Sequence, residues 1–269
     1  MEAWAIWYTG RTMSTSSPTA DATTRFSDRV ADYVRYRPGY PSEILSHLAQ
    51  TCALTPQSVI ADVGSGTGIL SRLFLENGNR VFGVEPNAEM RAAAEKLLAD
   101  YPRFVSLAGR AEATTLPDDS VDFVVAGQAF HWFDQEAARR EFQRILHPAG
   151  CIALVWNDRQ IDTTPFLSEY EQLLRTYATD YAVVNHKEVG LPALQRVFGD
   201  GIQRAVFDNR QRFDLAGVTG RLMSSSYAPL PGHPNHGPLM DGLRAAFERY
   251  NQNGGVEFLY TTELFYVQP

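Results

Sequence analysis

Three glycines at alternate positions follow an acidic residue in the stretch DVGSGTG, residues 62–68. Glycine lets the backbone turn sharply and lets a ligand approach it closely, and a helix that starts there offers free N–H groups. A dinucleotide pyrophosphate is one ligand for such a turn. The dinucleotide spacing G-x-G-x-x-G is broken, however, because Ile69 stands where the third glycine would be. The carboxylate of Asp62 would also repel phosphates, and it suits a ligand with an ammonium group.

A second acidic residue, Glu85, ends the next strand-like segment, RVFGVE. An acid at such a strand tip can accept hydrogen bonds from both hydroxyls of a ribose. Asn87, two residues later, is the better candidate for the N-cap of the following helix. The third strand leads to Ala111 and Glu112. The small Ala111 leaves room for a flat ring, and its N–H or the Glu112 carboxylate can meet the edge of a base.

Strand-like and helix-like segments alternate from residue 58 onward. This rhythm predicts a mostly parallel α/β sheet with helices on both faces. The predicted strands are 58–63, 80–85, 103–109, 121–127 and 151–157, and the predicted helices are 69–78, 87–100 and 134–150, the last ended by Pro148 and Gly150. The helix 87–100 would bury Met90, Ala94, Leu97 and Leu98 on one face. Upstream, Ser42 is expected to cap a helix that runs to about Cys52.

The pattern changes after residue 158. Residues 159–200 and 214–250 are mainly helix-like, 202–213 could be a strand, and 256–269 reads as a final strand. We therefore expect five regions. These are a disordered lead-in at 1–24, a helical cover at 25–55, an α/β core at 56–158, a helical substrate-covering insertion with strand six at 159–250, and a last core strand at 251–269. Met1 and Met13 both remain open as the start.

Composition narrows the classes of partner. The 269 residues carry 24 Lys plus Arg against 31 Asp plus Glu, a net charge of −7, with no basic run, which disfavours nucleic acid. No segment has the apolar length of a membrane helix or the layout of a signal peptide, so a cytoplasmic protein is expected. Cys52 and Cys151 are expected to be buried free thiols. His233 and His236 stand in a Pro/Gly loop without partner ligands, so no metal is expected.

Taken together, four segments resemble the class I S-adenosylmethionine-dependent methyltransferases. They are DVGSGTG (62–68), VFGVEPNAEM (81–90), GRAEATTLPDDSVDFVVAGQAFHWFD (109–134) and REFQRILHPAGCIALVWN (140–157). Each segment alone is weak evidence for this resemblance, whereas the four segments together are specific. The segments QAFHWFD and YRPGYP are most similar to the type-11 branch, which includes proteins similar to fungal trans-aconitate methyltransferases. The likeness covers about residues 25–157 and implies a Rossmann-like, seven-stranded sheet whose last strand is antiparallel.

The resemblance implies S-adenosyl-L-methionine as cofactor and a set of residues that bind it. The turn Gly64, Ser65, Gly66, Thr67 and Gly68 would pass under its methionine part. Asp62 would help to hold the ammonium group and Glu85 the ribose hydroxyls. The adenine would lie near Pro86 and Met90, with its edge at Ala111 and Glu112, and Gln128 would lie near the sulfonium.

The N-terminal segment and the region after strand five supply candidates for the rest of the site. Tyr33 offers an aromatic face for a sulfonium cation, and Arg37 suits the cofactor carboxylate. His131 follows the fourth strand and titrates near neutrality, so it is the candidate base. The alternative, which the sequence favours, is that His131 packs with Trp132 and Phe133 as a wall of the ligand site. Tyr227 could orient an acceptor oxygen or belong to the core.

We therefore expect an enzyme that transfers a methyl group in line to a small molecule, at a carboxylate or hydroxyl oxygen. A base is needed only for the hydroxyl. The sequence has no Asn-Pro-Pro-Tyr run after strand four, which with the acidic charge balance favours a small-molecule acceptor, and a monomer or homodimer is expected. Two alternatives stay open: a methyltransferase-fold binding or regulatory protein without turnover, and an NAD-dependent oxidoreductase.

Overall fold

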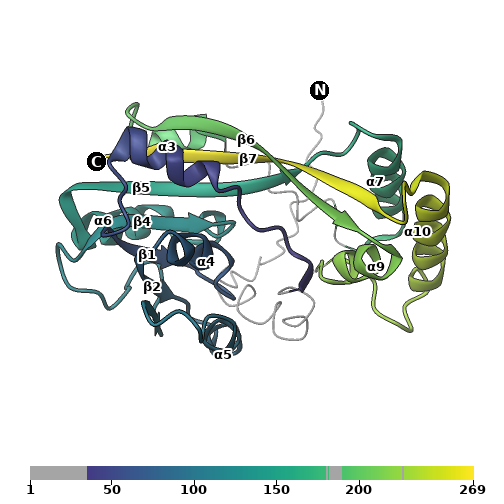
Figure 1. Ribbon diagram of the computed structural model, residues 1–269, viewed down its shortest axis with the longest axis horizontal. Coiled ribbons are helices and arrows are strands. Elements are labelled where there is room, and N and C mark those ends of the chain that lie inside the picture. Colours follow the sequence, from purple (N-terminus) through teal and green to yellow (C-terminus); the bar gives the residue numbers. More distant parts are fainter. Residues whose placement is uncertain (1–34, 180, 182–189, 226) are drawn as a thin grey trace, which may run out of the picture.

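The computed structural model describes residues 35–179, 181, 190–225 and 227–269. Seven strands form a single sheet in the order β3-β2-β1-β4-β5-β7-β6 (Figure 1). The pairs from β3 through β5 are parallel, whereas β7 runs antiparallel to both β5 and β6. The mostly parallel sheet with an antiparallel last strand is thus confirmed. The strands are β1 (Val59–Val63), β2 (Arg80–Val84), β3 (Phe104–Leu107), β4 (Val121–Gly127), β5 (Leu146–Arg159), β6 (Gln203–Phe213) and β7 (Val256–Val267).

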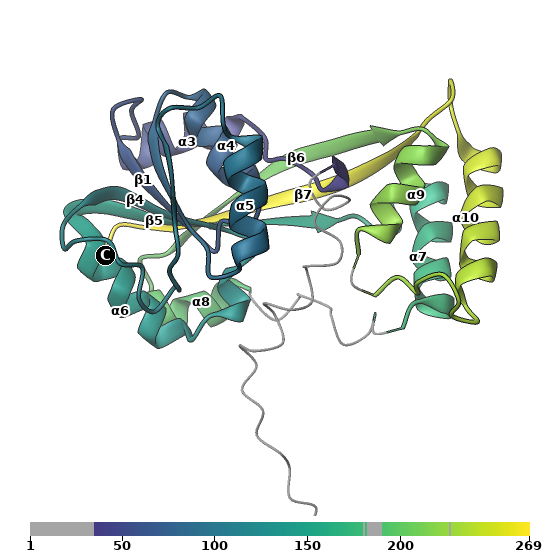
Figure 2. The same cartoon turned by 90° about the horizontal axis from the view of Figure 1, so that it is seen from below.

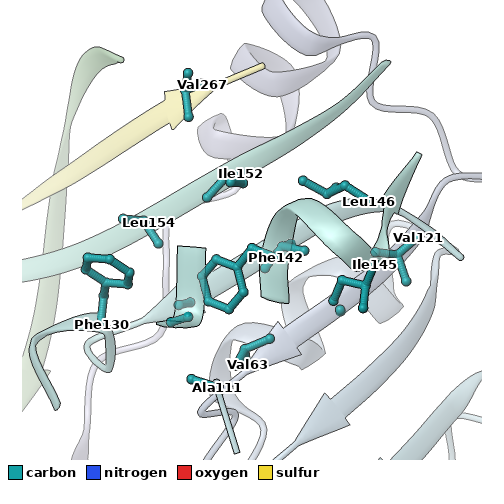
Figure 3. Packing of buried hydrophobic residues seen from close by; sticks show 14 of the residues in the cluster. Val63, Ala111, Val121, Phe130, Phe142, Ile145, Leu146, Ile152, Leu154 and Val267 are labelled. Atoms are coloured by element: carbon teal, nitrogen blue, oxygen red, sulfur yellow. The ribbon is translucent and has the colours of Figure 1, made fainter. Parts of the chain in front are cut away.

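Helices cover both faces of this sheet (Figure 2). One face carries α3 (Glu43–Cys52), α4 (Ile69–Glu76) and, at its flank, α5 (Ala88–Leu97). The other carries α6 (Gln135–Ile145) and α8 (Leu191–Phe198). The central strands serve both layers because successive side chains point to opposite faces. In β5, for example, Ile152 and Leu154 pack towards α6, as Figure 3 shows, whereas Cys151 and Ala153 pack towards α3 and α4.

A third packed unit, the helical lobe, consists of α7 (Pro165–Tyr177), α9 (Leu215–Met223) and α10 (His236–Tyr250). Its core includes Phe258 and Tyr260 of β7, so the lobe is built on the far end of the sheet. The strands β5, β7 and β6 are long, with 14, 12 and 11 residues, and they run from the α/β core into the lobe (Figure 1).

Residues 35–41 join the lobe to the core a second time. The ring of Tyr36 packs on Gly220 of α9, where an added Cβ would lie 2.0 Å from it. The carbonyl of Gly39 accepts hydrogen bonds from the side-chain amides of Asn157 (3.1 Å) and Asn209 (2.9 Å). Tyr40 then places its hydroxyl against Gly127 at the end of β4. This short stretch therefore spans the space between α9 and β4.

Several sequence-based expectations are corrected. The helix predicted over 134–150 ends at Ile145, because Leu146 already pairs with Val121 and begins β5. Leu97 is 46% exposed, and Leu98 alone of that pair is buried. Ser42 occupies the N-cap of α3, but its side chain makes no capping hydrogen bond.

The predicted covers also divide differently. Within the expected cover 159–250, α8 packs with α6 on the α/β core and does not join the helical lobe. Within 25–55, α3 packs on the sheet itself. The two cysteines are buried free thiols, as expected, and their sulfur atoms are in contact at 2.9 Å across α3 and β5. Among the described helices, none combines the length and apolar character that crossing a membrane requires.

Candidate cofactor and acceptor site

The predicted cofactor residues follow the carboxyl ends of neighbouring parallel strands. The glycine turn follows β1, Glu85 follows β2, and Gln128 follows β4. These three strands are adjacent and parallel, so their ends meet at one edge of the sheet. This is the edge at which open α/β sheets bind ligands.

The turn between β1 and α4 is fixed to the end of β2. The N–H of Gly64 donates to the carbonyl of Val84 at 2.8 Å, and the N–H of Gly66 donates to Oε2 of Glu85 at 3.0 Å. The other carboxylate oxygen of Glu85 accepts from the N–H of Asn87 at 2.9 Å. Asn87 in turn caps α5, as predicted, by accepting from the N–H groups of Glu89 and Met90. Glu85 therefore lies directly beside the glycine turn.

The three glycines have positive φ angles, +69° at Gly64, +55° at Gly66 and +83° at Gly68, which other residues rarely adopt. Their surroundings differ. A Cβ on Gly64 would lie 2.7 Å from Ala129, and one on Gly68 would lie 2.6 Å from Leu98. A Cβ on Gly66 would meet no atom of the described residues within 4 Å. Packing thus explains Gly64 and Gly68, whereas Gly66 borders open space of the kind that a ligand could fill.

Asp62 lies beneath the turn and is fully buried. Its Oδ2 accepts a hydrogen bond from the hydroxyl of Ser71 at 2.6 Å, but Oδ1 has no hydrogen-bond partner among the described residues. The hydroxyl of Thr67 in the same turn also lacks one. Burial raises the pKa of Asp62 to about 7. A buried polar atom without a partner is costly, and an ammonium group would satisfy Oδ1, so this acid fits the predicted cofactor.

The predicted adenine residues surround the same edge. Met90 is buried in α5, Pro86 is exposed, and Ala111 is buried after β3. Glu112 accepts a hydrogen bond from the N–H of Asp134 at 3.0 Å, at the start of α6. Its other oxygen is 3.4 Å from Arg110. Burial raises the pKa of Glu85 as well.

The segment after β4 supplies the side expected to face the acceptor. Gln128 has a positive φ of +57°, and its side-chain amide donates to the carbonyl of Asn157 at 3.0 Å. His131 lies in the short 3₁₀ helix Phe130–Trp132, and its ring centroid is 4.9 Å from that of Trp132. The base and the wall interpretations of His131 both fit this position.

Two predicted site residues lie with the helical lobe instead. The Arg37 guanidinium donates to the carbonyl of Ser224, just after α9, at 3.2 Å. The ring of Tyr227 packs edge-on against that of Tyr181, with centroids 4.9 Å apart. No described contact joins Tyr227 to His131. Tyr33 lies outside the described residues.

Ala129 was not predicted as a site residue, but its side chain lies against the glycine turn at Gly64. Phe133, which the sequence offers with His131 and Trp132 as a possible wall of the ligand site, also lies against Gly64. In the sequence, only the aromatic run QAFHWF indicated that this segment contacts the turn. An open hollow beside α7, lined among others by Asp162, Glu169 and Arg175, contains none of the predicted site residues. Within the described residues, no group of three or more His, Cys, Asp or Glu side chains is arranged to hold a metal.

The strand order, the antiparallel β7 and the glycine turn at the sheet edge define a class I methyltransferase fold. A solved structure from Anaeromyxobacter dehalogenans, assigned as a type II methyltransferase, matches 86% of this chain and 97% of its own with a TM-score of 0.66 and 22% identity. A methyltransferase of Geobacter sulfurreducens, solved with S-adenosylhomocysteine, matches 92% of this chain and 98% of its own with a TM-score of 0.50 and 17% identity. At these identities the likeness concerns the fold.

Residues 61–154 match the family model described as a methyltransferase domain. An uncharacterised methyltransferase-like protein of Schizosaccharomyces pombe is 35% identical over 156 residues, which is 58% of this chain and 59% of the relative. An uncharacterised methyltransferase of Mycobacterium tuberculosis is 40% identical over 139 residues, 52% of this chain and 54% of the relative. The chain thus spans little more than half the length of these relatives. The prediction of a class I methyltransferase domain is confirmed.

Proposed function

We propose that the protein transfers a methyl group from S-adenosyl-L-methionine to a small-molecule acceptor, at an oxygen atom. The main support is the open space at Gly66, whose N–H donates to the Glu85 carboxylate, together with the buried Oδ1 of Asp62, which has no hydrogen-bond partner among the described residues. This combination suits a ligand with a ribose at one end and an ammonium group at the other. The bound cofactor would supply an electrophilic methyl group.

The residues of this chain would act mainly by positioning. Asp62 would hold the ammonium group and Glu85 the ribose, so that the methyl group faces the segment after β4. Well-oriented reactants can gain on the order of 7–11 kcal/mol of barrier reduction. A carboxylate acceptor needs no base, whereas a hydroxyl acceptor would pass its proton to a base, for which His131 is the candidate.

Isothermal titration with S-adenosylmethionine and S-adenosylhomocysteine tests this proposal, followed by a mass-spectrometric screen of acids, phenols and amines with labelled cofactor. Binding of both ligands and one labelled product are expected. Absence of binding at high micromolar concentration would refute the proposal. Quenching of NADH fluorescence would favour the oxidoreductase. Binding without turnover on any acceptor would favour a regulatory protein, whose partner binding would survive Gly66→Arg.

Replacing Glu85 by Ala is expected to weaken the binding of S-adenosylhomocysteine by about 1–3 kcal/mol, the scale of losing charged hydrogen bonds. The same change frees the N–H of Gly66, which Glu85 holds at 3.0 Å. Titration calorimetry measures the effect, and Glu89→Ala is the control, since Glu89 is an exposed acid in the first turn of α5. Equal affinities for the Glu85 variant and the parent protein would mean that the ribose binds elsewhere.

We also propose that the protein is cytoplasmic, that it is a monomer or homodimer, and that it has no nucleic-acid partner. The net charge of −7 supports the last of these.

A further inference from the structure

The helical lobe contains a buried arginine for which the described residues supply no counter-ion. Arg221 of α9 is 5% exposed. Its Nε donates to the hydroxyl of Tyr260 and one terminal nitrogen donates to the hydroxyl of Ser225, both at 3.2 Å. The guanidinium also lies 5.9 Å from the centre of the Phe258 ring. Among the described residues no carboxylate lies within ion-pair distance of it. A guanidinium stays charged in proteins, and a buried charge that lacks an opposite charge is costly.

A second, largely buried arginine in this region has its charge balanced by a carboxylate. Arg159, at the end of β5, forms an ion pair with Glu171 at 2.5 Å, and both side chains are 10% exposed. It also donates to the hydroxyl of Tyr181 at 2.9 Å. Glu171 is already shared with the exposed Arg175. Among the described residues, the lobe therefore sets the two guanidinium groups of Arg159 and Arg221 against the single carboxylate of Glu171, and Arg221 has no anion beside it.

A buried tyrosine hydroxyl near these two arginines also lacks a hydrogen-bond partner among the described residues. Tyr170 of α7 is 1% exposed, and its hydroxyl makes no hydrogen bond with the described residues. It lies within electrostatic range of both Arg221 and Arg159. Burial raises the pKa of Tyr170, so the hydroxyl stays protonated and available as a donor. Arg221 and Tyr170 thus offer a cation and a hydrogen-bond donor, and no described carboxylate accepts a hydrogen bond from either of them.

This cluster lies close to the place where methyl transfer is proposed. Gln128 contacts the carbonyl of Asn157, and Arg159 is two residues further along β5, about 7 Å. From the other side, the stretch 36–40 reaches from Gly220, next to Arg221, to Gly127, and five residues span at most ~14 Å between their end Cα atoms. In both views α9 is the lobe helix nearest to the α/β core (Figures 1 and 2).

We propose that Arg221 and Tyr170 bind a carboxylate group of the methyl acceptor, so that the acceptor is an organic acid anchored in the helical lobe. The planar guanidinium matches the two oxygens of a carboxylate, and the Tyr170 hydroxyl donates to the same group. The proposal rests on the proposed function. The anchored carboxylate fixes the orientation of the acceptor, and it can differ from the group that receives the methyl. Arg221 and Tyr170 are then residues that determine specificity.

Binding and turnover are both measured, so that the two proposals fail separately. Short dicarboxylic acids and their diamides are titrated into the protein saturated with S-adenosylhomocysteine, and the same compounds are offered as acceptors with labelled cofactor. The parent protein should bind at least one acid 10-fold or more tighter than its diamide. Arg221→Gln should abolish this preference and lower kcat/KM for acids at least 100-fold, mainly through KM, with unchanged affinity for S-adenosylhomocysteine. Arg249→Gln, an exposed arginine of the same lobe, should behave like the parent protein.

Tyr170→Phe covers the case in which the Arg221 variant does not fold. It removes a hydroxyl that makes no hydrogen bond with the described residues, so it should fold normally and bind acids about 5- to 10-fold more weakly. Equal binding of acids and diamides by the parent protein would overturn the inference, as would acid binding that survives both Arg221→Gln and Tyr170→Phe. Acid binding without any binding of S-adenosylhomocysteine would instead overturn the proposed function and leave the anion site standing.

Discussion

Asp62→Asn is expected to stabilise the ligand-free protein at pH 8 and at the same time to weaken its binding of S-adenosylhomocysteine. Asp62 is fully buried, and its Oδ1 has no hydrogen-bond partner within the described part of the chain. An ionised carboxylate there is unfavourable until an ammonium group arrives. Asparagine can still accept the hydrogen bond from Ser71, which Asp62 accepts at 2.6 Å, and it carries no charge. Stability lost to a binding residue is a common feature of functional sites.

The pH dependence of this effect follows from the pKa of Asp62, which burial raises to about 7 from an ordinary value of 3.8. Between these values the folded protein holds a proton that the unfolded chain has released, so the contribution of Asp62 to stability falls as pH rises from about 4 to 7. Above pH 7 the loss is complete, ~2–4 kcal/mol. The Asn variant escapes it, so its advantage is largest at pH 8 and at pH 5 should be about half or less.

Denaturant unfolding of both proteins at pH 5 and pH 8 measures the stability difference, and calorimetry across the same range measures binding. The affinity of the parent protein for S-adenosylhomocysteine should fall about fivefold from pH 7 to pH 6, because binding requires the proton of Asp62 to leave, and about half of the protein has already lost it at pH 7. The Asn variant should bind more weakly at pH 8 and lack this steep dependence. A variant that is less stable than the parent protein at pH 8 would show that Asp62 is not an unfavourable buried acid.

Gly64→Ala and Gly66→Ala should separate the packing role of the glycine turn from its ligand role. Both positions have a positive φ, which costs alanine roughly 1–2 kcal/mol. At Gly64 the new methyl group would also lie 2.7 Å from Ala129 and 2.9 Å from Phe133. Overpacking adds about 1–3 kcal/mol, so Gly64→Ala should lose ~2–5 kcal/mol of unfolding free energy. At Gly66 the methyl group meets no atom of the described part of the chain within 4 Å, so the stability loss should stay near ~1–2 kcal/mol.

The binding of S-adenosylhomocysteine should show a different pattern. The methyl group of Gly66→Ala occupies the space proposed for the cofactor, so affinity should fall at least tenfold in a protein that remains folded. Thermal or denaturant unfolding and calorimetry on the two variants provide the measurement. Parental affinity in Gly66→Ala would mean that the cofactor does not pass over the turn. Parental stability in Gly64→Ala would contradict the contacts with Ala129 and Phe133.

The sequence contained enough information to predict the α/β core and the cofactor edge. Buried strands, glycine positions and caps are local signals, and parallel strands necessarily bring Gly66 and Glu85 to the same edge. The end of α6 was missed because Pro148 and Gly150 suggest a helix stop, whereas pairing of Leu146 with Val121 decides where β5 begins. Such pairing involves residues far apart in the chain and leaves no local pattern.

The acceptor side was much less predictable. Arg221 stands as one charged residue in the otherwise apolar or small helix LAGVTGRLM, a pattern that gives no indication of its partners. Its contact with Tyr260 spans 39 residues, and the unpartnered hydroxyl of Tyr170 comes from another helix. Tyr227 was singled out for its segment, yet its described ring contact is with Tyr181. Only tertiary structure shows which charges in the lobe remain uncompensated.

The strands β5, β6 and β7 run without interruption from the α/β core into the helical lobe. The stiffness of the sheet therefore fixes the distance between the core and the lobe. A lobe on a single linker could move freely relative to the core. This lobe is instead connected to the core by three strands that are hydrogen-bonded to one another. Bending or twisting them strains many ladder bonds at once, so large hinge motions are disfavoured. The lobe also cannot melt by itself without fraying the β6 edge, so we expect both ends to unfold in one cooperative transition.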